Sequence, residues 1–322
     1  MLLKSLFLRI ISFIVASAML MFSGIGSHSE YDVKDPDNLK LNFTVISDSH
    51  IEGNNYERYK VFAQACKDLN ANKSGNDAVI FLGDNTMNGQ MIENTIFHGT
   101  VSMLLKNQKV LPVVGNHDIG NGQGDYEKLQ NRWYDFTGAF FGKSLDRPYY
   151  YEVIDGCYFI VLGMEAQEVY EMYISDEQFA WLEDTLSKAA ESGKPAFVFS
   201  HYPADEVTDK DGEYISRLID MLAEYNKEND IFMFVGHTHM PMYLFWSFRD
   251  EGFPEIYLPR VTELGGEGDN EIIKNTGVGA EIEVYENEVT VRARDFYSGE
   301  WRYEEDEGKF CEMTYQLKNP VK

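Results

Sequence analysis

The chain has 322 residues, of which 44% are hydrophobic and 25% charged, and its formal net charge is −25 at pH 7. This length and apolar content are ample for the hydrophobic core of one large domain or two smaller ones. The acidic excess argues against nucleic acid as a partner, because like charges repel, and otherwise indicates a solubilising surface.

Residues 1–26 have the pattern of a secretory leader. Lys4 and Arg9 come first, the apolar run IISFIVASAMLMF follows, and SGIGSHSE supplies small and polar residues. This order predicts a signal peptide cleaved after Gly26 or Ser27, and hence a secreted, periplasmic or cell-surface protein. An uncleaved N-terminal anchor is the alternative, although the apolar run is slightly shorter than a comfortable membrane span. No later stretch is long enough to cross a bilayer.

Residues 27–40 are polar and carry no hydrophobic period, so we expect a linker that leads into a single domain over residues 41–322. In that domain, five apolar β-rich runs alternate with helical patterns. The runs are LNFTVIS, AVIFLG, VLPVVG, AFVFS and IFMFVG, and the helical patterns are YERYKVFAQACKDLNAN, SDEQFAWLEDTLSKAAES and EYISRLIDMLAEYNKE. Strands and helices in alternation are typical of an α/β layered domain.

The second helical pattern has clear ends. We expect it to begin after an N-cap at Ser175 or Asp176 and to end just before Gly193.

Two further segments predict antiparallel strands. PYYYEVIDGCYFIVLGM predicts a hairpin that turns at Asp155–Gly156. From Gly277 onward, period-two alternation with turns at Glu286–Asn287 and Ser298–Gly299 predicts more antiparallel strands. We expect these C-terminal strands to form a second sheet that packs on the first.

The three cysteines, Cys66, Cys157 and Cys311, are odd in number and widely spaced, so no disulfide framework can be inferred. Cys66 lies on the apolar face of a helical pattern and Cys157 lies in a strand-like run. We expect both to be small buried hydrophobic residues rather than metal or redox groups.

Each of the five apolar runs of the α/β pattern ends in a cluster of polar residues. Ligands of open α/β sheets bind beyond the carboxyl ends of the strands, so these clusters are expected to converge. Five of the seven histidines fall in them, whereas His98 lies in a helical pattern where an ordinary core or surface role is expected. The candidate residues are Asp48, His50, Asp84, Asn116, His117, His201, His237 and His239.

This donor set is too large for one tetrahedral zinc ion and contains no thiolate. It suits two divalent ions that share Asp84, because ions about 3.5 to 4 Å apart can hold both the attacking and the leaving oxygen of an in-line displacement. Nitrogen and oxygen donors permit manganese, iron, zinc or nickel. Glycines before Asp84, Asn116 and His237 allow a sharp turn and a close approach. Any one of these motifs alone would be common in loops. The prediction of a metal site is specific because all five motifs occur in order along the chain, each at the end of an apolar run.

The series Asp48-x-His50, Gly83-Asp84, Gly115-Asn116-His117-Asp118, His201 and Gly236-His237-x-His239 resembles the calcineurin-like metallophosphoesterase superfamily over residues 43–239. The resemblance implies an α/β fold in which two mixed β-sheets lie face to face and helices flank them (α/β/β/α). It also implies a first metal ion held by Asp48, His50, Asp84 and His239, and a second held by Asp84, Asn116, His201 and His237. His117 would contact the substrate phosphate or protonate the leaving oxygen, and a hydroxide between the ions would attack phosphorus.

Met87 departs from two branches of that superfamily. The protein Ser/Thr phosphatases have an aspartate at this position and the purple acid phosphatases a tyrosine, and a thioether replaces neither. The remaining resemblance is to the broad bacterial group that includes cyclic-nucleotide phosphodiesterases. We therefore expect hydrolysis of a small phosphodiester or phosphomonoester; a metal-bearing binding protein without turnover and a nuclease are the alternatives.

The loops after the motifs should select the substrate. One of them carries Tyr243, Phe245, Trp246 and Phe248, which we expect to pack against the second sheet, with stacking on a base or contact with a lipid as the alternative. Lys210 and Arg249 are candidate contacts for a phosphate or a headgroup.

Overall fold

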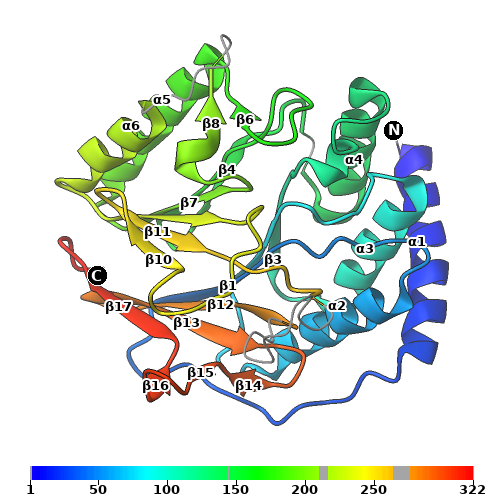
Figure 1. Ribbon diagram of the computed structural model, residues 1–322, viewed down its shortest axis with the longest axis horizontal. Coiled ribbons are helices and arrows are strands. Elements are labelled where there is room, and N and C mark those ends of the chain that lie inside the picture. Colours follow the sequence, from blue (N-terminus) through cyan, green and yellow to red (C-terminus); the bar gives the residue numbers. More distant parts are fainter. Residues whose placement is uncertain (1, 144, 210–216, 264–275, 322) are drawn as a thin grey trace.

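The computed structural model describes residues 2–143, 145–209, 217–263 and 276–321. Two mixed β-sheets face each other in the middle of the molecule, and helices cover both outer faces (Figure 1). This arrangement confirms the predicted α/β/β/α class.

The first sheet has the order β14-β13-β12-β1-β2-β3, with β17 paired to β13. Its parallel strands are β1 (Leu41–Ile46), β2 (Ala78–Leu82) and β3 (Lys109–Val113). The antiparallel strands are β12 (Val278–Val284), β13 (Glu288–Asp295), β14 (Glu300–Trp301) and β17 (Glu312–Gln316).

The second sheet has the order β10-β11-β9-β7-β5-β4. Its strands are β4 (Tyr150–Ile154), β5 (Cys157–Val161), β7 (Ala196–Ser200), β9 (Ile231–Val235), β10 (Phe248–Asp250) and β11 (Pro254–Tyr257). The described residues also form two small two-stranded sheets. In one, β6 (Met172–Tyr173) pairs with β8 (Val207–Thr208), and in the other, β15 (Tyr303–Glu304) pairs with β16 (Lys309–Phe310). All five apolar runs of the α/β pattern are therefore strands, distributed over both sheets.

The C-terminal strands correct one prediction. They do not form a second sheet but extend the first, because β12 pairs with the free edge of β1, with Val45 opposite Ala280. Period-two alternation specifies an antiparallel strand with two unlike faces, but it does not specify which sheet edge the strand joins. The predicted hairpin between β4 and β5 is confirmed. Asp155 and Gly156 both have positive φ, 48° and 81°, as a two-residue hairpin turn requires.

The helices cover the two sheets from opposite sides. On the side of the first sheet lie α2 (Tyr56–Asp68), α3 (Met91–Leu104) and α4 (Tyr126–Phe141), and on the side of the second lie α5 (Asp176–Ser192) and α6 (Arg217–Asn226) (Figure 1). Short 3₁₀ helices span Leu69–Ala71, His117–Ile119 and Ala204–Glu206.

The ends predicted for α5 are confirmed. The Ser175 side chain accepts a hydrogen bond from the Gln178 amide, and Gly193 takes the left-handed conformation after the last turn. The residues predicted to begin α6, 213–216, lie outside the described residues.

The core has three layers, and the central one lies between the sheets. Phe43 of β1 is fully buried there, and its ring contacts four phenylalanines at centroid distances of 4.8 to 6.0 Å: Phe159, Phe197, Phe199 and Phe234. Each buried side chain of this kind contributes roughly 1.5–3 kcal/mol. Cys66 and Cys157 are buried and free, as predicted.

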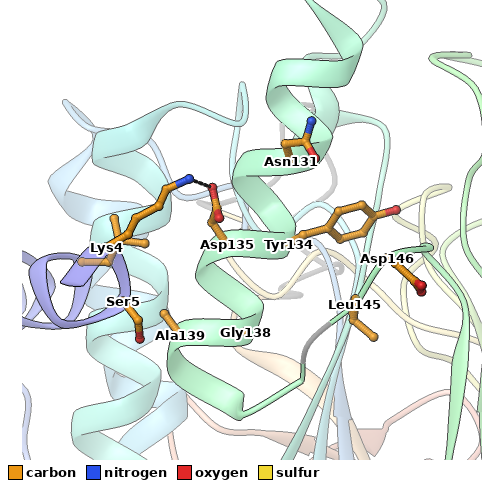
Figure 2. Close-up of a pocket in the computed structure, with 10 residues that line it drawn as sticks. Lys4, Ser5, Asn131, Tyr134, Asp135, Gly138, Ala139, Leu145 and Asp146 are labelled. Carbon is orange, nitrogen blue, oxygen red and sulfur yellow. Dashed lines mark hydrogen bonds and ion pairs between the residues drawn. The ribbon is translucent and has the colours of Figure 1, made fainter. Parts of the chain in front are cut away.

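The N-terminal helix α1 (Leu2–Ser23) lies along α3 and also contacts α4 (Figure 1). Its inner face carries small residues, so that Ser12 and Ala16 lie against Gly99, where a Cβ would come within 2.6 Å of the Ser12 carbonyl oxygen. Lys4 pairs with Asp135 of α4 beside a cavity of about 620 Å³ that no predicted site residue lines (Figure 2). Among the described residues, α1 alone is long and apolar enough to cross a membrane.

The segment 27–40 has no helix or strand beyond one bridge, yet its side chains are held in place. His28 Nδ1 lies 2.7 Å from an Asp68 carboxylate oxygen, and the Tyr31 hydroxyl donates a hydrogen bond to Glu281. The buried Arg294 guanidinium donates to Asp68 at 2.8 Å and stacks on the Tyr31 ring at 3.6 Å. A polar stretch of sequence therefore contributes a buried network between α2 and the first sheet.

We predict that Glu281 makes the protein less stable as pH rises from about 5 to about 7. Burial raises the pKa of Glu281 to about 7 from 4.5, despite the hydrogen bond from Tyr31. Between these two pKa values the folded protein keeps a proton on Glu281 that the unfolded chain has already released. The free energy of unfolding therefore falls as pH rises across this window, by at most about 3 kcal/mol. Glu281→Gln should flatten this part of the pH profile of urea unfolding. The exposed Glu286→Gln is the control, and an equal slope in both variants would contradict the assignment.

Candidate metal centre

Five loops converge at one end of the two sheets, each at the carboxyl end of its strand. They follow β1, β2 and β3 of the first sheet and β7 and β9 of the second. Backbone hydrogen bonds hold the loops together: the His50 amide donates to the Asp84 carbonyl at 2.8 Å, and the Gly236 amide donates to the His201 carbonyl at 3.0 Å. The two sheets are joined directly, because the His237 amide donates to Asp48 Oδ2 at 3.3 Å.

A first group of candidate donors consists of Asp48, His50 and His239. His239 Nε2 lies 3.2 Å from His50 Nε2 and 3.1 Å from Asp48 Oδ1, and His50 Nε2 lies 3.4 Å from the same carboxylate oxygen. Ligands about 2.1 Å from a tetrahedral cation lie about 3.4 Å from one another. The spacing and the chemistry of these donors therefore fit one cation.

A second group consists of Asp84, Asn116, His201 and His237. His201 Nε2 lies 3.2 Å from both Asp84 Oδ2 and Asn116 Oδ1, and a His237 ring nitrogen lies within 4.8 Å of donor atoms of Asp84 and His201. Asp84 Oδ2 is also 3.6 Å from His50 Nε2. One carboxylate oxygen thus faces both groups.

His117 completes the set at the rim. Its Nδ1 lies 2.7 Å from the Met87 carbonyl oxygen, which leaves Nε2 directed to the cluster, 4.0 Å from Asp84 Oδ2. The ring meets that of His50 edge-on at 4.6 Å. All eight residues singled out in the sequence are therefore brought together.

The backbone of the site is unusual. Seven non-glycine residues in the described part of the chain have positive φ, and five of them are candidate donors: Asp48 (55°), His50 (40°), Asp84 (48°), His237 (61°) and His239 (51°). A non-glycine residue held in a sparsely populated backbone region costs on the order of 1–3 kcal/mol. The surrounding hydrogen bonds must hold these conformations in place.

The glycines before the donors matter more for letting neighbouring loops approach each other closely than for turning the chain. Gly83 has a φ of 93°, and a Cβ there would lie 2.5 Å from His201 Nδ1. Gly115 and Gly236 do not have positive φ, but a Cβ at Gly115 would lie 2.2 Å from Asp84 Oδ1, and one at Gly236 would lie 2.2 Å from Ser47 Oγ. A side chain at these positions would push the loops apart.

The two buried carboxylates are strongly acidic. Burial acts to raise the pKa of Asp48, but hydrogen bonds from His239 and His50 lower it well below its usual range. Burial also opposes ionisation of Asp84, yet the neighbouring His201 lowers its pKa to about 2. Both groups are therefore anionic donors at neutral pH.

The histidines differ in their affinity for protons. Burial lowers the pKa of His50 and of His237 to about 4, so both are neutral donors. Burial has the same tendency at His201, but the charge of Asp84 raises the pKa of this imidazole to about 9. A cation that binds beside His201 must displace a proton, which makes its affinity dependent on pH.

Two supporting residues carried little sequence signal. Asn121 Oδ1 accepts a hydrogen bond from Asn116 Nδ2 at 2.9 Å, which directs the Asn116 oxygen toward His201. The buried Asp118 accepts hydrogen bonds from three backbone amides, those of Asn85, Thr86 and Gly115. Only its position after Asn116-His117 could have pointed to Asp118, and nothing pointed to Asn121.

The aromatic loop corrects a second prediction. Phe248 and Tyr243 are partly buried, but Phe245 is 83% exposed and Trp246 is 59% exposed, so packing against the sheet is wrong for these two. Aromatic composition does not specify which residues of a short loop face solvent. The Arg249 guanidinium stacks on the Tyr257 ring at 4.2 Å, and Lys210 lies outside the described residues.

Carboxylate, amide and imidazole donors gathered at the strand ends of a two-sheet α/β fold are the arrangement that a metal-dependent hydrolase requires. Residues 41–241 match the calcineurin-like phosphoesterase family, and the chain belongs to this family.

The comparisons with individual proteins agree with this family. The chain is 28% identical over 217 residues to a protein of Arcobacter nitrofigilis named probable glycerophosphodiester phosphodiesterase GpdQ, a match that covers 63% of this chain and 73% of that protein.

Two solved structures share the fold at low identity. A dimetal phosphatase from Danio rerio has a TM-score of 0.54 at 16% identity, over 80% of this chain and 97% of that one. Purple acid phosphatase PPD1 from yellow lupin (Lupinus luteus) seeds has a TM-score of 0.56 at 13% identity, over 85% of this chain but only 53% of its own length. At such identities the likeness extends to the fold alone.

We predict that Gly115→Ala destabilises the protein by about 1–3 kcal/mol, because the new methyl group overlaps Asp84 and the backbone must move. Urea unfolding of the metal-free protein measures the change. Gly138→Ala, inside α4, is the control: its Cβ would lie 3.3 Å from the nearest atom, and the change should stay within about 1 kcal/mol. Equal effects of the two substitutions would show that the close approach at Gly115 is unimportant.

Proposed function

We propose that the chain is an exported phosphoesterase that uses two metal ions to hydrolyse a small phosphodiester or phosphomonoester. The observation that carries the proposal is the position of Asp84 Oδ2, 3.6 Å from His50 Nε2 and 3.2 Å from His201 Nε2. A carboxylate oxygen between two sets of donors is suited to bridging two cations.

The proposed ligands form two sets that share Asp84. Asp48, His50, Asp84 and His239 would hold the first ion, and Asp84, Asn116, His201 and His237 would hold the second. Oxygen and nitrogen donors fit manganese, iron, zinc or nickel. When bound, such a pair of ions activates a water molecule and takes up the charge of the phosphoryl oxygens.

The chain's own residues would orient the reaction. Asn121 fixes the Asn116 amide so that its oxygen faces inward. The Met87 carbonyl oxygen accepts a hydrogen bond from His117 Nδ1, which turns Nε2 toward the site, where the imidazolium form can donate a proton to a phosphoryl or leaving oxygen. Asp118 holds together the loops that carry Asp84 and Asn116.

The remaining candidate functions are less well supported. A binding protein of this fold without turnover would not need the complete donor set or an oriented His117. A nuclease is disfavoured by the net charge of −25. The name of the Arcobacter relative favours a phosphodiester as the substrate.

We predict that the purified protein, reconstituted with manganese, hydrolyses bis-p-nitrophenyl phosphate or p-nitrophenyl phosphate, and that a chelator abolishes the reaction. Asp84→Asn and Asn116→Ala should each lower kcat/KM at least about 100-fold, because each removes a donor from the proposed centre. Release of p-nitrophenolate is the measurement. Asp184→Asn, the same change on the exposed face of α5, is the control.

Activity that survived the Asp84 or Asn116 substitution would reject the assigned ligands. Elemental analysis of the same samples tests the number of ions. Far fewer than two transition ions per chain after reconstitution in excess metal would reject a dinuclear centre, and absence of turnover with any metal would favour the binding protein.

Export is proposed from the apolar helix α1 and the small residues that follow it. We predict that protein recovered from outside the cytoplasm begins at residue 27 or 28, because Gly24 and Gly26 fit a signal peptidase. N-terminal sequencing of that protein is the measurement. A chain that retains residues 1–26 in the membrane fraction would instead establish the anchor.

A further inference from the structure

Two arginines, Arg58 and Arg260, lie beside the first group of candidate donors. They come from distant parts of the sequence, the first turn of α2 and the segment after β11. Neither belongs to the metal-binding motifs of the chain. Their surroundings indicate what they could bind.

Arg58 is placed by the loop that carries Asp84. Its Nη1 lies 3.8 Å from the sulfur of Met87, the residue whose carbonyl oxygen holds His117. Its side chain is only 20% exposed, and the nearest carboxylate that pairs with it is that of Glu52, 3.7 Å away and partly exposed. Arg58 therefore contacts the residue that orients His117, and Met87 and Glu52 are the side-chain partners of Arg58 among the described residues.

Arg260 is placed by the loop that carries Asp48. It forms a parallel bridge with Ser47, and the next amide, that of Val261, donates to the Ser47 carbonyl at 3.0 Å. Its charge is close enough to act on Asp48 and Asp84. Its charge also acts on His50, so the half-buried guanidinium lies within electrostatic range of the first group of candidate donors.

The two guanidinium groups lie within electrostatic range of each other. Burial and the charge of Arg58 both lower the pKa of Arg260. The Nε atoms of both arginines are buried, and neither has a hydrogen-bond partner among the described residues. A buried donor without a partner is destabilising, more so when it is charged, so an occupant that accepts hydrogen bonds from these guanidinium groups would be stabilising.

The carboxylates of the site would not act as counter-charges for the two arginines once cations are bound. Asp48 and Asp84 would then be neutralised by the metal ions. Among the described residues, the carboxylates left beside the arginines would be Glu52, 3.7 Å from Arg58, and Glu263, whose charge acts on Arg260. Paired guanidinium groups match the oxygens of a carboxylate or a phosphate.

We propose that Arg58 and Arg260 form a subsite for a second anionic group of the substrate, a carboxylate or a further phosphate, next to the phosphoryl group that reacts. The location of this subsite rests on the proposed function, since the reacting phosphoryl group is placed over the candidate metal centre. The substrate class is then a phosphate ester in which one esterified group carries its own negative charge. The arginines are specificity-determining residues and take no part in bond cleavage.

A pair of esters that share the reacting group tests the proposal: 2-carboxyethyl 4-nitrophenyl phosphate and ethyl 4-nitrophenyl phosphate. Wild-type protein should have the higher kcat/KM with the carboxylated ester. Arg58→Gln and Arg260→Gln should each lower that value about tenfold or more and change the value for the ethyl ester less than about threefold, because a hydrogen bond to a charged group is worth about 1.5–3 kcal/mol. Arg260→Lys keeps the charge and should retain part of the preference.

Lys60→Gln is the matched control, because it removes one positive charge from α2 in a residue that pairs with Glu57. It should leave the ratio of the two esters unchanged. Equal losses on both esters in the arginine variants would show that the arginines serve the reacting phosphoryl group or the fold, and would overturn the proposal.

Calorimetry of the metal-loaded protein gives a readout that needs no turnover. Wild-type protein should bind phosphonoacetate at least about tenfold more tightly than methylphosphonate, and Arg58→Gln and Arg260→Gln should lose this difference. The absence of any preference in the wild type would overturn the subsite. A protein that keeps the preference but hydrolyses neither ester would reject the proposed activity and not the subsite.

Discussion

The close approach of the loops around Asp84 is the constraint on which the rest of the site depends. Gly115 brings its backbone so near that a methyl group would overlap the Asp84 carboxylate, and Gly83 does the same against the His201 ring. This proximity places one carboxylate oxygen between donors from both sheets. The phenylalanine layer between the sheets holds them at a fixed separation, so packing in the core and donor geometry at the rim are coupled.

Much of the fold could be predicted from the sequence. The five apolar runs are buried on both faces and could be recognised as strands without knowledge of their partners. The ends of α5 could be predicted because Ser175 and Gly193 act locally, as the N-cap residue and as the left-handed residue after the last turn. The sequence could not show which sheet β12 joins, since a strand with two unlike faces fits the edge of either sheet. The buried role of the Tyr31 side chain could not be predicted either, because its partners Glu281 and Arg294 are more than 200 residues away in the chain.

The candidate donors could also be predicted, because each stands in a short motif with a distinct residue type. The residues that hold these donors in place could not be predicted. Asn121 acts through one hydrogen bond to Asn116, and Arg58 and Arg260 become neighbours only after the chain has folded. The same holds for the electrostatic contrast across the site. Burial and the charge of Arg260 both lower the pKa of His50, whereas a Glu206 carboxylate oxygen lies 3.9 Å from His237.

The left-handed backbone at the candidate donors has an evolutionary consequence. Aspartate and histidine are among the few residues other than glycine and asparagine that often adopt this conformation, and both are also good ligands for divalent ions. Ligand chemistry and backbone chemistry therefore select the same residues at Asp48, His50, Asp84, His237 and His239. Glutamate or cysteine could donate to a metal ion but would be disfavoured by the left-handed backbone, so the backbone alone opposes drift toward other sets of metal ligands.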